Sequence, residues 1–263
     1  RVSTAIIGTG FMGRVHAEQI RRLGFVDIAG VASVNAAEAA AFGQAMGIER
    51  TTGDYKELLA DPTIQAVHVL TPNALHYPVS MDALNAGKAV LCEKPLAVSA
   101  KEASNMLKLA EKKGLVHAVN HNLRYYPIVQ HIRQYIASGE LGEVLHVQGT
   151  YSQDWLLYDT DFNWRIETKD NGALRAVGDI GSHWMDMIQH LTGLAGGGTH
   201  VAHHATRADA LTALAGRLVG LGSGHDQRRP FVFFSWPAWY LKVRVGANSP
   251  SLWPIMFSVT NTG

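Results

Sequence analysis

The chain has 263 residues, one cysteine, and 23 lysine and arginine residues against 22 acidic ones, for a net charge of +1. This balance gives no basic surface for nucleic acid, and no apolar run approaches the ~18 residues of a membrane span, so we expect a small-molecule partner. The lone Cys92 excludes an internal disulfide and favours a reducing, cytoplasmic location.

Short β-rich runs alternate with helical patterns over the first 120 residues, which is typical of βαβ units around a parallel sheet. We predict strands at residues 4–8, 26–32, 66–70, 89–93 and 116–120, within a doubly wound sheet of about six strands, and helices at 11–23 and 36–46. The sequences "DYKE" (54–57) and "SAKE" (99–102) predict two further helix starts. Gly87 and Gly114 stand where helix ends are expected.

The pattern changes near residue 120, and we place a domain boundary there. Residues 1–120 are predicted to be a dinucleotide-binding domain and residues 121–263 a second domain, so that the fold class is α/β. The second domain should contain a helix from about residue 127, a strand at 143–152, a loop rich in tryptophan and aspartate, and a helix at 182–193. The chain begins with Arg1, almost directly on a strand, which leaves open whether a targeting segment precedes it.

The motif "GTGFMG" carries Gly8, Gly10 and Gly13 directly after the first strand and opens a helix, with Phe11 and Met12 between the glycines. Glycine suits a tight turn, close backbone approach to a pyrophosphate, and helix packing on the strand. This context predicts a dinucleotide site. The alternative is a glycine-rich turn that binds nothing.

The end of the second strand bears on the choice between NAD and NADP. Ser33 stands where an NAD site usually has an acidic residue, and this removes repulsion against a 2'-phosphate. No lysine or arginine follows until Arg50, so no phosphate clamp is evident either. We therefore predict NAD or NADP, with Asn35 as a candidate ribose ligand.

Two loops should face the same crevice, because ligands of open α/β sheets bind beyond the carboxyl ends of the strands. The first is "TPNALH", residues 71–76, and the second begins after the strand at 89–93, in "CEKPLA". Their candidate cofactor-binding residues are Thr71, Pro72, Asn73, His76, Glu93 and Lys94. From spacing alone, Lys94 could equally be a solvated lysine at a strand end.

The sequence "GDIGSHWMD" places Asp179, His183 and Asp186 at intervals of four and three, which share one face if the segment is helical. Three interpretations remain open: a helix cap with satisfied core polar groups, a catalytic face, or a metal site. Two carboxylates and one histidine lack a firm ligand set, so no metal is predicted.

Six motifs, taken in order, resemble those of the Gfo/Idh/MocA oxidoreductases, and the resemblance extends from residue 1 to about 195. They are "GTGFMGRVHA", "TPNALH", "CEKPLA", "NLRYYP", "WR" at 164–165 and "GDIGSHWMD". The resemblance implies an N-terminal Rossmann domain and a C-terminal α/β domain with an open, largely antiparallel sheet, often a subunit contact. It also implies NAD or NADP as cofactor and a sugar, cyclitol or polyol as substrate. A homo-oligomer, dimer or tetramer, is expected if the second domain is complete.

In that family the E-K-P lysine and the aspartate and histidine of D-x-G-x-H form the catalytic set, which here means Lys94, Asp179 and His183. Histidine suits the base that removes a hydroxyl proton, and an ammonium stabilises developing alkoxide charge. Weaker candidates for binding sugar hydroxyls are Arg124, Tyr125, Trp164 and Arg165. The alternatives are an NAD-dependent glycosidase of the same fold and a non-catalytic dinucleotide sensor, which would lack the lysine or histidine.

The last 68 residues differ in composition from the rest of the chain. Only two of the 22 acidic residues, Asp209 and Asp226, fall in residues 196–263, and the family resemblance is expected to end near 195. One explanation is a divergent second domain whose aromatic residues form a subunit contact. The other, which we favour, is a reading-frame error after about residue 195; the coding DNA separates the two.

Overall fold

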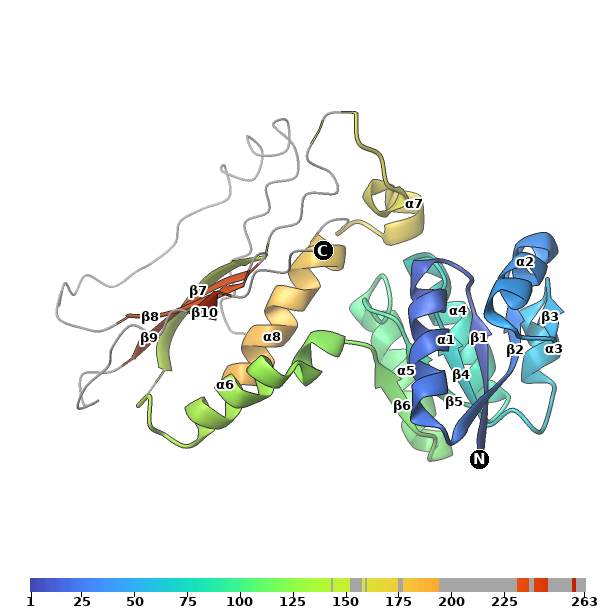
Figure 1. Ribbon diagram of the computed structural model, residues 1–263, viewed down its shortest axis with the longest axis horizontal. Coiled ribbons are helices and arrows are strands. Elements are labelled where there is room, and N and C mark those ends of the chain that lie inside the picture. Colours follow the sequence, from blue (N-terminus) through green and yellow to red (C-terminus); the bar gives the residue numbers. More distant parts are fainter. Residues whose placement is uncertain are drawn as a thin grey trace. The chain divides into compact units, whose positions relative to one another are not determined.

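The computed structural model describes residues 1–142, 144–151, 158, 160–174, 177–193, 231–236, 239–245 and 257–258 (Figure 1). The chain divides into two compact units, Arg1–Asn120 with Glu167–Arg175, and His121–Ile166 with Ala176–Gly263. The segment Glu167–Arg175 thus belongs to the first unit, whereas the sequence predicts continuous domains on either side of residue 120. The reason is a long-range contact, because the Asn73 side chain donates a hydrogen bond to the Asn171 side chain.

The first unit is built on a six-stranded parallel sheet with the order β3-β2-β1-β4-β5-β6. Its strands are β1 (Val2–Ile7), β2 (Val26–Ala32), β3 (Thr51–Thr52), β4 (Ala66–Val69), β5 (Ala89–Cys92) and β6 (His117–Val119). Strand β3 is absent from the predicted elements because two residues show no alternation; it is defined by its pairing with β2. The strand order reverses between β1 and β4, and in such sheets ligands bind beyond the carboxyl ends at that point.

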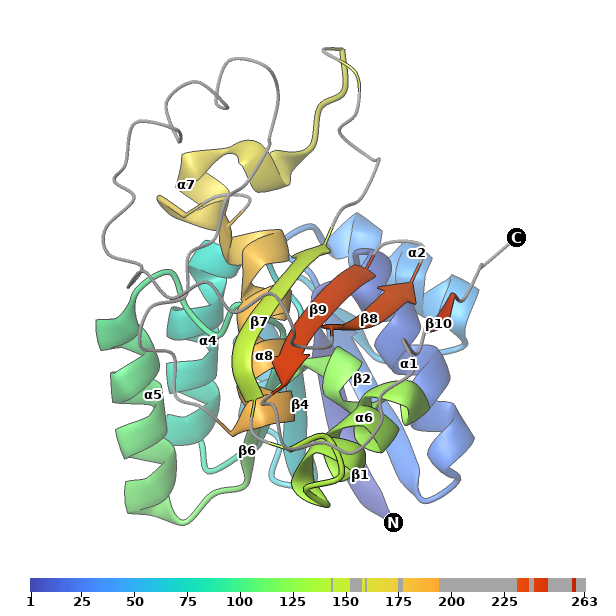
Figure 2. The same ribbon diagram turned by 90° about the vertical axis from the view of Figure 1, so that its left-hand side faces the viewer.

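Helices cover both faces of this sheet (Figure 2). They are α1 (Phe11–Leu23), α2 (Ala36–Met46), α3 (Tyr55–Leu59), α4 (Asn73–Asn85) and α5 (Ala100–Lys113). The short α7 (Thr168–Asn171) also belongs to this unit and packs against α4. Successive residues of β1 alternate between two cores: Ile6 packs with α1 and α2, while Ala5 and Ile7 pack with α3, α4 and α5. This alternation is the period of two expected of a strand buried on both faces.

The predicted ends of the helices in the first unit agree with the structure except at one position. The side chains of Asp54 and Ser99 cap α3 and α5 as predicted, and Gly114 ends α5 in the left-handed conformation. Gly87 is not itself the cap of α4. The cap residue of α4 is Ala86, and Gly87 follows it in the left-handed conformation, with φ +76°. In such a helix end the left-handed glycine stands one position after the cap.

The second unit combines helices with a four-stranded sheet of order β10-β8-β9-β7, in which β9 is antiparallel to β7 and β8, and β10 is parallel to β8. Its elements are η1 (Asn122–Tyr125), α6 (Pro127–Ala137), β7 (Val144–Tyr151), η2 (Trp164–Ile166), the π-helical turn η3 (Val177–Gly181), α8 (Ser182–Thr192), β8 (Phe231–Trp236), β9 (Trp239–Val245) and β10 (Phe257–Ser258). Val129, Ile132, Trp184 and Met187 form a buried core between α6 and α8.

Beyond residue 195 the structure describes only β8, β9 and β10. Strands β8 and β9 pair in the antiparallel sense. The segment 200–220, on which the frame-error hypothesis partly rests, lies outside the described residues. Within the described part of the chain, none of the helices has both the length and the apolar character needed to cross a bilayer.

Candidate cofactor and catalytic sites

The three glycines of the first loop are required for different physical reasons. Gly8 has φ +117°, and a Cβ there would lie 2.4 Å from the carbonyl oxygen of Leu70. A Cβ on Gly13 would lie 2.6 Å from the Gly8 carbonyl oxygen. A Cβ on Gly10, by contrast, would meet nothing within 4 Å. The fold therefore requires Gly8 and Gly13, whereas Gly10 borders open space at the start of α1, where a ligand can approach the backbone.

The five helices α1 to α5 of the first unit fall into two classes at their N-termini. Side chains of Asn35, Asp54 and Ser99 cap α2, α3 and α5. Each of these helices also carries an acidic residue in its first turn: Glu38, Glu57 and Glu102. The α1 and α4 helices, which begin after Gly10 and Pro72, have neither a capping side chain nor an acidic first turn. Their backbone N–H groups and positive dipole ends are thus left for an anion at the switch point between β1 and β4.

Phe11 and Met12 form the first turn of α1, and the Phe11 ring is 75% exposed. At the end of β2, Ser33 is partly exposed, and Asn35 accepts hydrogen bonds from the backbone N–H groups of Ala37 and Glu38 at 3.0 and 3.4 Å. The carbonyl oxygen of the Asn35 side chain is thus used to cap α2.

The loop after β4 is fixed by its own buried polar groups. The His76 ring lies between the carbonyl oxygens of Pro95, 2.7 Å from Nδ1, and Thr71, 2.9 Å from Nε2. Burial lowers the pKa of His76, against the opposing effect of its hydrogen bonds to these two carbonyl oxygens. Asn73 is also buried and bonded to Asn171. His76 therefore links the loops after β4 and β5, and Asn73 links α4 to α7. The buried Thr71 Oγ1 has no hydrogen-bond partner among the described residues.

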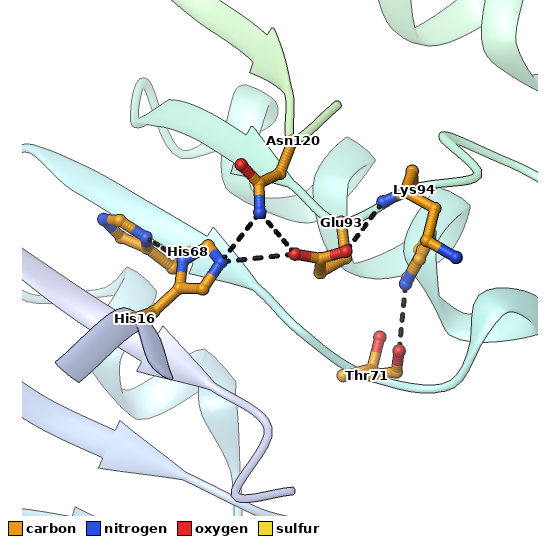
Figure 3. Close-up of polar contacts among 7 residues, drawn as sticks. His16, His68, Thr71, Glu93, Lys94 and Asn120 are labelled. Atoms are coloured by element: carbon orange, nitrogen blue, oxygen red, sulfur yellow. Dashed lines mark hydrogen bonds and ion pairs between the residues drawn. The ribbon is translucent and has the colours of Figure 1, made fainter. Parts of the chain in front are cut away.

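A buried polar cluster lies behind Lys94 (Figure 3). His16 Nε2 is 3.2 Å from Glu93 Oε1, and His16 Nδ1 is 2.8 Å from His68 Nδ1. Asn120 donates a hydrogen bond from Nδ2 to Glu93 Oε1 at 2.6 Å. The backbone N–H of Lys94 donates to Glu93 Oε2 at 3.1 Å. Side chains from α1, from β4 and from the residues directly after β5 and β6 therefore fix the backbone at the point where Lys94 leaves the sheet.

The charges in this cluster are set by opposing effects. Burial raises the pKa of Glu93, but the hydrogen bonds from His16 and Asn120 outweigh it, so the pKa is lowered and Glu93 is a carboxylate. Burial, together with the charge of His16, lowers the pKa of His68 to about 4. His68 is therefore neutral near pH 7. Glu93 is a predicted cofactor-binding residue, and its carboxylate is bonded within this cluster. The cluster itself was not predicted, because its members lie far apart in the sequence.

In the second unit, Asp179 and His183 occupy different kinds of helix. Asp179 is buried in the π-helical turn η3, whereas His183 is in the first turn of α8, so the regular α-helical spacing expected from the sequence is not present. The wider π turn shifts the register between them. Asp179 Oδ1 is 3.6 Å from Arg165 Nε. The His183 ring packs edge-on against the rings of His121 and Tyr151, with centroids 6.1 and 5.7 Å away.

The remaining predicted substrate residues differ in their surroundings. The Arg124 guanidinium forms a two-bond ion pair with the Asp186 carboxylate, one bond being Nε to Oδ2 at 2.8 Å. Tyr125 is 78% exposed. Arg165 stacks on Trp164, with its guanidinium carbon 4.6 Å from the ring centroid. Trp164, Arg165 and Asp179 therefore form a connected set within this unit, whereas Lys94 belongs to the first unit.

Comparisons with known proteins agree with this geometry. Residues 2–121 match the model of an oxidoreductase family with an NAD-binding Rossmann fold, and residues 129–213 match the GFO/IDH/MocA C-terminal domain, extending past residue 195, where the sequence resemblance was expected to end. A levoglucosan dehydrogenase from Pseudarthrobacter phenanthrenivorans is 33% identical over 73% of this chain and 51% of its own length. An NADP(+) scyllo-inositol 2-dehydrogenase from Bacillus subtilis is 33% identical over 54% of this chain and 38% of its own length. A solved levoglucosan dehydrogenase complex with NADH and levoglucosan has a TM-score of 0.70 at 33% identity, over 73% of this chain and 54% of that one.

Proposed function

This chain belongs to the GFO/IDH/MocA family of NAD-binding oxidoreductases, and we propose that it transfers a hydride between a nicotinamide and a hydroxyl or carbonyl carbon of a sugar, cyclitol or related polyol. Three curated relatives match more than two thirds of this chain, and the chain spans about half of the length of each of them. The names of these relatives, a levoglucosan dehydrogenase and a glucose-6-phosphate 3-dehydrogenase among them, support the substrate class.

The observation that carries the proposal is the pair of uncapped helices at the switch point. A dinucleotide pyrophosphate requires N–H donors, positive dipole ends and space for close backbone approach. The α1 and α4 helices supply the first two, and Gly10 supplies the third. The residues of the first unit therefore fit a dinucleotide, with Gly8, Gly10, Gly13 and Thr71 as the proposed contacts.

When bound, the nicotinamide supplies the hydride acceptor or donor. We assign Lys94 to the substrate oxygen, where its ammonium group would stabilise developing alkoxide charge. His183 would take the hydroxyl proton during oxidation and return it during reduction. Asp179 would orient or charge-balance this pair, and its Oδ1 atom also lies 3.6 Å from Arg165 Nε.

The substrate contacts are proposed on chemistry and exposure. Arg165 and Trp164 offer a stacked guanidinium and an indole, a combination that suits the hydroxyls and apolar ring faces of sugars. The exposed Tyr125 offers a phenol. Arg124 is engaged by Asp186, so we propose that any part it plays depends on that ion pair.

The test is a spectrophotometric screen of the purified chain with NAD and NADP against levoglucosan, inositols and common aldoses. We expect reduction of the dinucleotide with at least one of these compounds. Calorimetry with NADH provides the matched binding measurement. Binding without turnover on any substrate would favour the sensor alternative, and release of an aglycone from a glycoside without net dinucleotide reduction would favour the glycosidase.

A further inference from the structure

We propose that Glu38 makes this chain selective for NAD(H) over NADP(H). It would do so by supplying, from the first turn of α2, the carboxylate that dinucleotide sites usually obtain from the end of the second strand. The inference rests on the proposed function, because it presumes that a dinucleotide binds the first unit. It concerns only the ribose end of that site.

The position of the Glu38 side chain follows from the way α2 begins. Asn35 caps the helix, which places Glu38 in its first turn. From there the side chain turns back: Glu38 Oε2 accepts a hydrogen bond from Ser33 Oγ at 3.3 Å, and Glu38 Oε1 accepts one from Asn35 Nδ2 at 3.4 Å. Since β2 ends at Ala32, these contacts hold a negative charge next to the carboxyl end of β2.

That position matters because the adenosine ribose of a dinucleotide binds beside the end of the second strand. A carboxylate there can accept hydrogen bonds from the two ribose hydroxyls of NAD. The 2'-phosphate of NADP would instead place roughly two negative charges beside this carboxylate, which would repel them. Ser33, which by itself tolerates a 2'-phosphate, therefore acts together with a carboxylate that the strand sequence does not reveal.

The cations that could reverse this preference are few. Arg50 is the first lysine or arginine after β2. It forms an ion pair with Asp61 and donates a hydrogen bond to the Glu57 carbonyl oxygen at 3.1 Å. The exposed Arg14 of α1 is the other basic side chain near the glycine loop in the sequence. Of these two candidates for a 2'-phosphate, Arg50 already has two partners.

The experiment measures dissociation constants of NADH and NADPH for the full purified chain by calorimetry at low salt. We expect NADH to bind about 10-fold or more tightly than NADPH. In Glu38→Gln the ratio should fall towards one, and Glu38→Lys should favour NADPH. Glu49→Gln removes one exposed negative charge elsewhere on the first unit and should leave the ratio unchanged. Because Glu38 is exposed, these variants should fold, and circular dichroism verifies this.

Three results would overturn the inference. They are equal affinity for the two dinucleotides in the wild type, an unchanged ratio in Glu38→Gln, and tight NADPH binding that Arg14→Ala abolishes. Each of these leaves dinucleotide binding itself intact, so the proposed function would survive. Binding of neither NADH nor NADPH would instead refute the proposed function, and the inference with it.

Discussion

Substitutions at Gly8 and Gly10 should separate the requirements of the fold from those of the cofactor. At Gly8 an alanine must adopt φ +117°, which costs a side chain about 1–3 kcal/mol. Its Cβ also lies 2.4 Å from a backbone oxygen of Leu70, and forcing the two central strands apart costs a further ~1–3 kcal/mol. We therefore expect Gly8→Ala to lower the free energy of unfolding by about 4 kcal/mol, a large fraction of the stability of a typical domain.

Gly10→Val should behave in the opposite way. Gly10 has φ −72°, which any residue adopts, and open space at its Cβ, so we expect a change in unfolding free energy within about 1 kcal/mol. The valine side chain would nevertheless fill the approach to the N-terminus of α1 and weaken NADH binding by ~100-fold or more.

Circular dichroism during denaturation is the assay for stability, because all six tryptophans lie beyond residue 150, outside the sheet and main helices of the first unit. Calorimetry gives the NADH affinity. A folded Gly10→Val variant with normal affinity, or one as unstable as Gly8→Ala, would refute this reasoning.

Three further predictions concern other residues. Lys94→Ala and His183→Ala should each lower turnover by ~100-fold or more while NADH affinity stays within about twofold; a near-normal rate in either variant would remove that residue from the catalytic set. The pKa of His68 is lowered from 6.5 to about 4, so at a pH between these two values His68 binds a proton in the unfolded chain but not in the folded one. The free energy of unfolding of the wild type should therefore fall by up to ~3 kcal/mol as the pH decreases through this range. His68→Val should remove this part of the pH dependence, and identical profiles in urea titrations of the two proteins would contradict it. Tyr55→Phe deletes the 2.7 Å hydrogen bond from the phenol to Asp82 and should cost about 1.5 kcal/mol, whereas no measurable loss would show that solvent replaces the bond.

Local signals in the sequence were sufficient for most elements of the first unit. The helices predicted at 11–23 and 36–46 have those bounds in the structure, and the capping side chains of Asp54 and Ser99 are confirmed. These features depend on residues within a few positions of each other. For the same reason the two-residue strand β3, which depends on pairing with β2, could not be predicted.

The polar architecture of the candidate sites depends on contacts that sequence patterns do not reveal. The hydrogen bond from Asn73 to Asn171 and the contact of His16 with Glu93 join residues 98 and 77 positions apart. Glu38 is different, because a local signal was present. "NAAE" at 35–38 has the same cap and glutamate spacing as "DYKE" and "SAKE", and would have placed a carboxylate near the end of β2.

The most direct test of the central claim is isotope transfer. The purified chain is incubated with NAD or NADP and a sugar or cyclitol that is active in the screen and carries deuterium on the carbon to be oxidised, and the reduced dinucleotide is analysed by mass spectrometry. We predict that the deuterium appears in the reduced nicotinamide, one per molecule of carbonyl product. Loss of the deuterium to water, or product formation without any labelled dinucleotide, would contradict hydride transfer as the reaction of this chain.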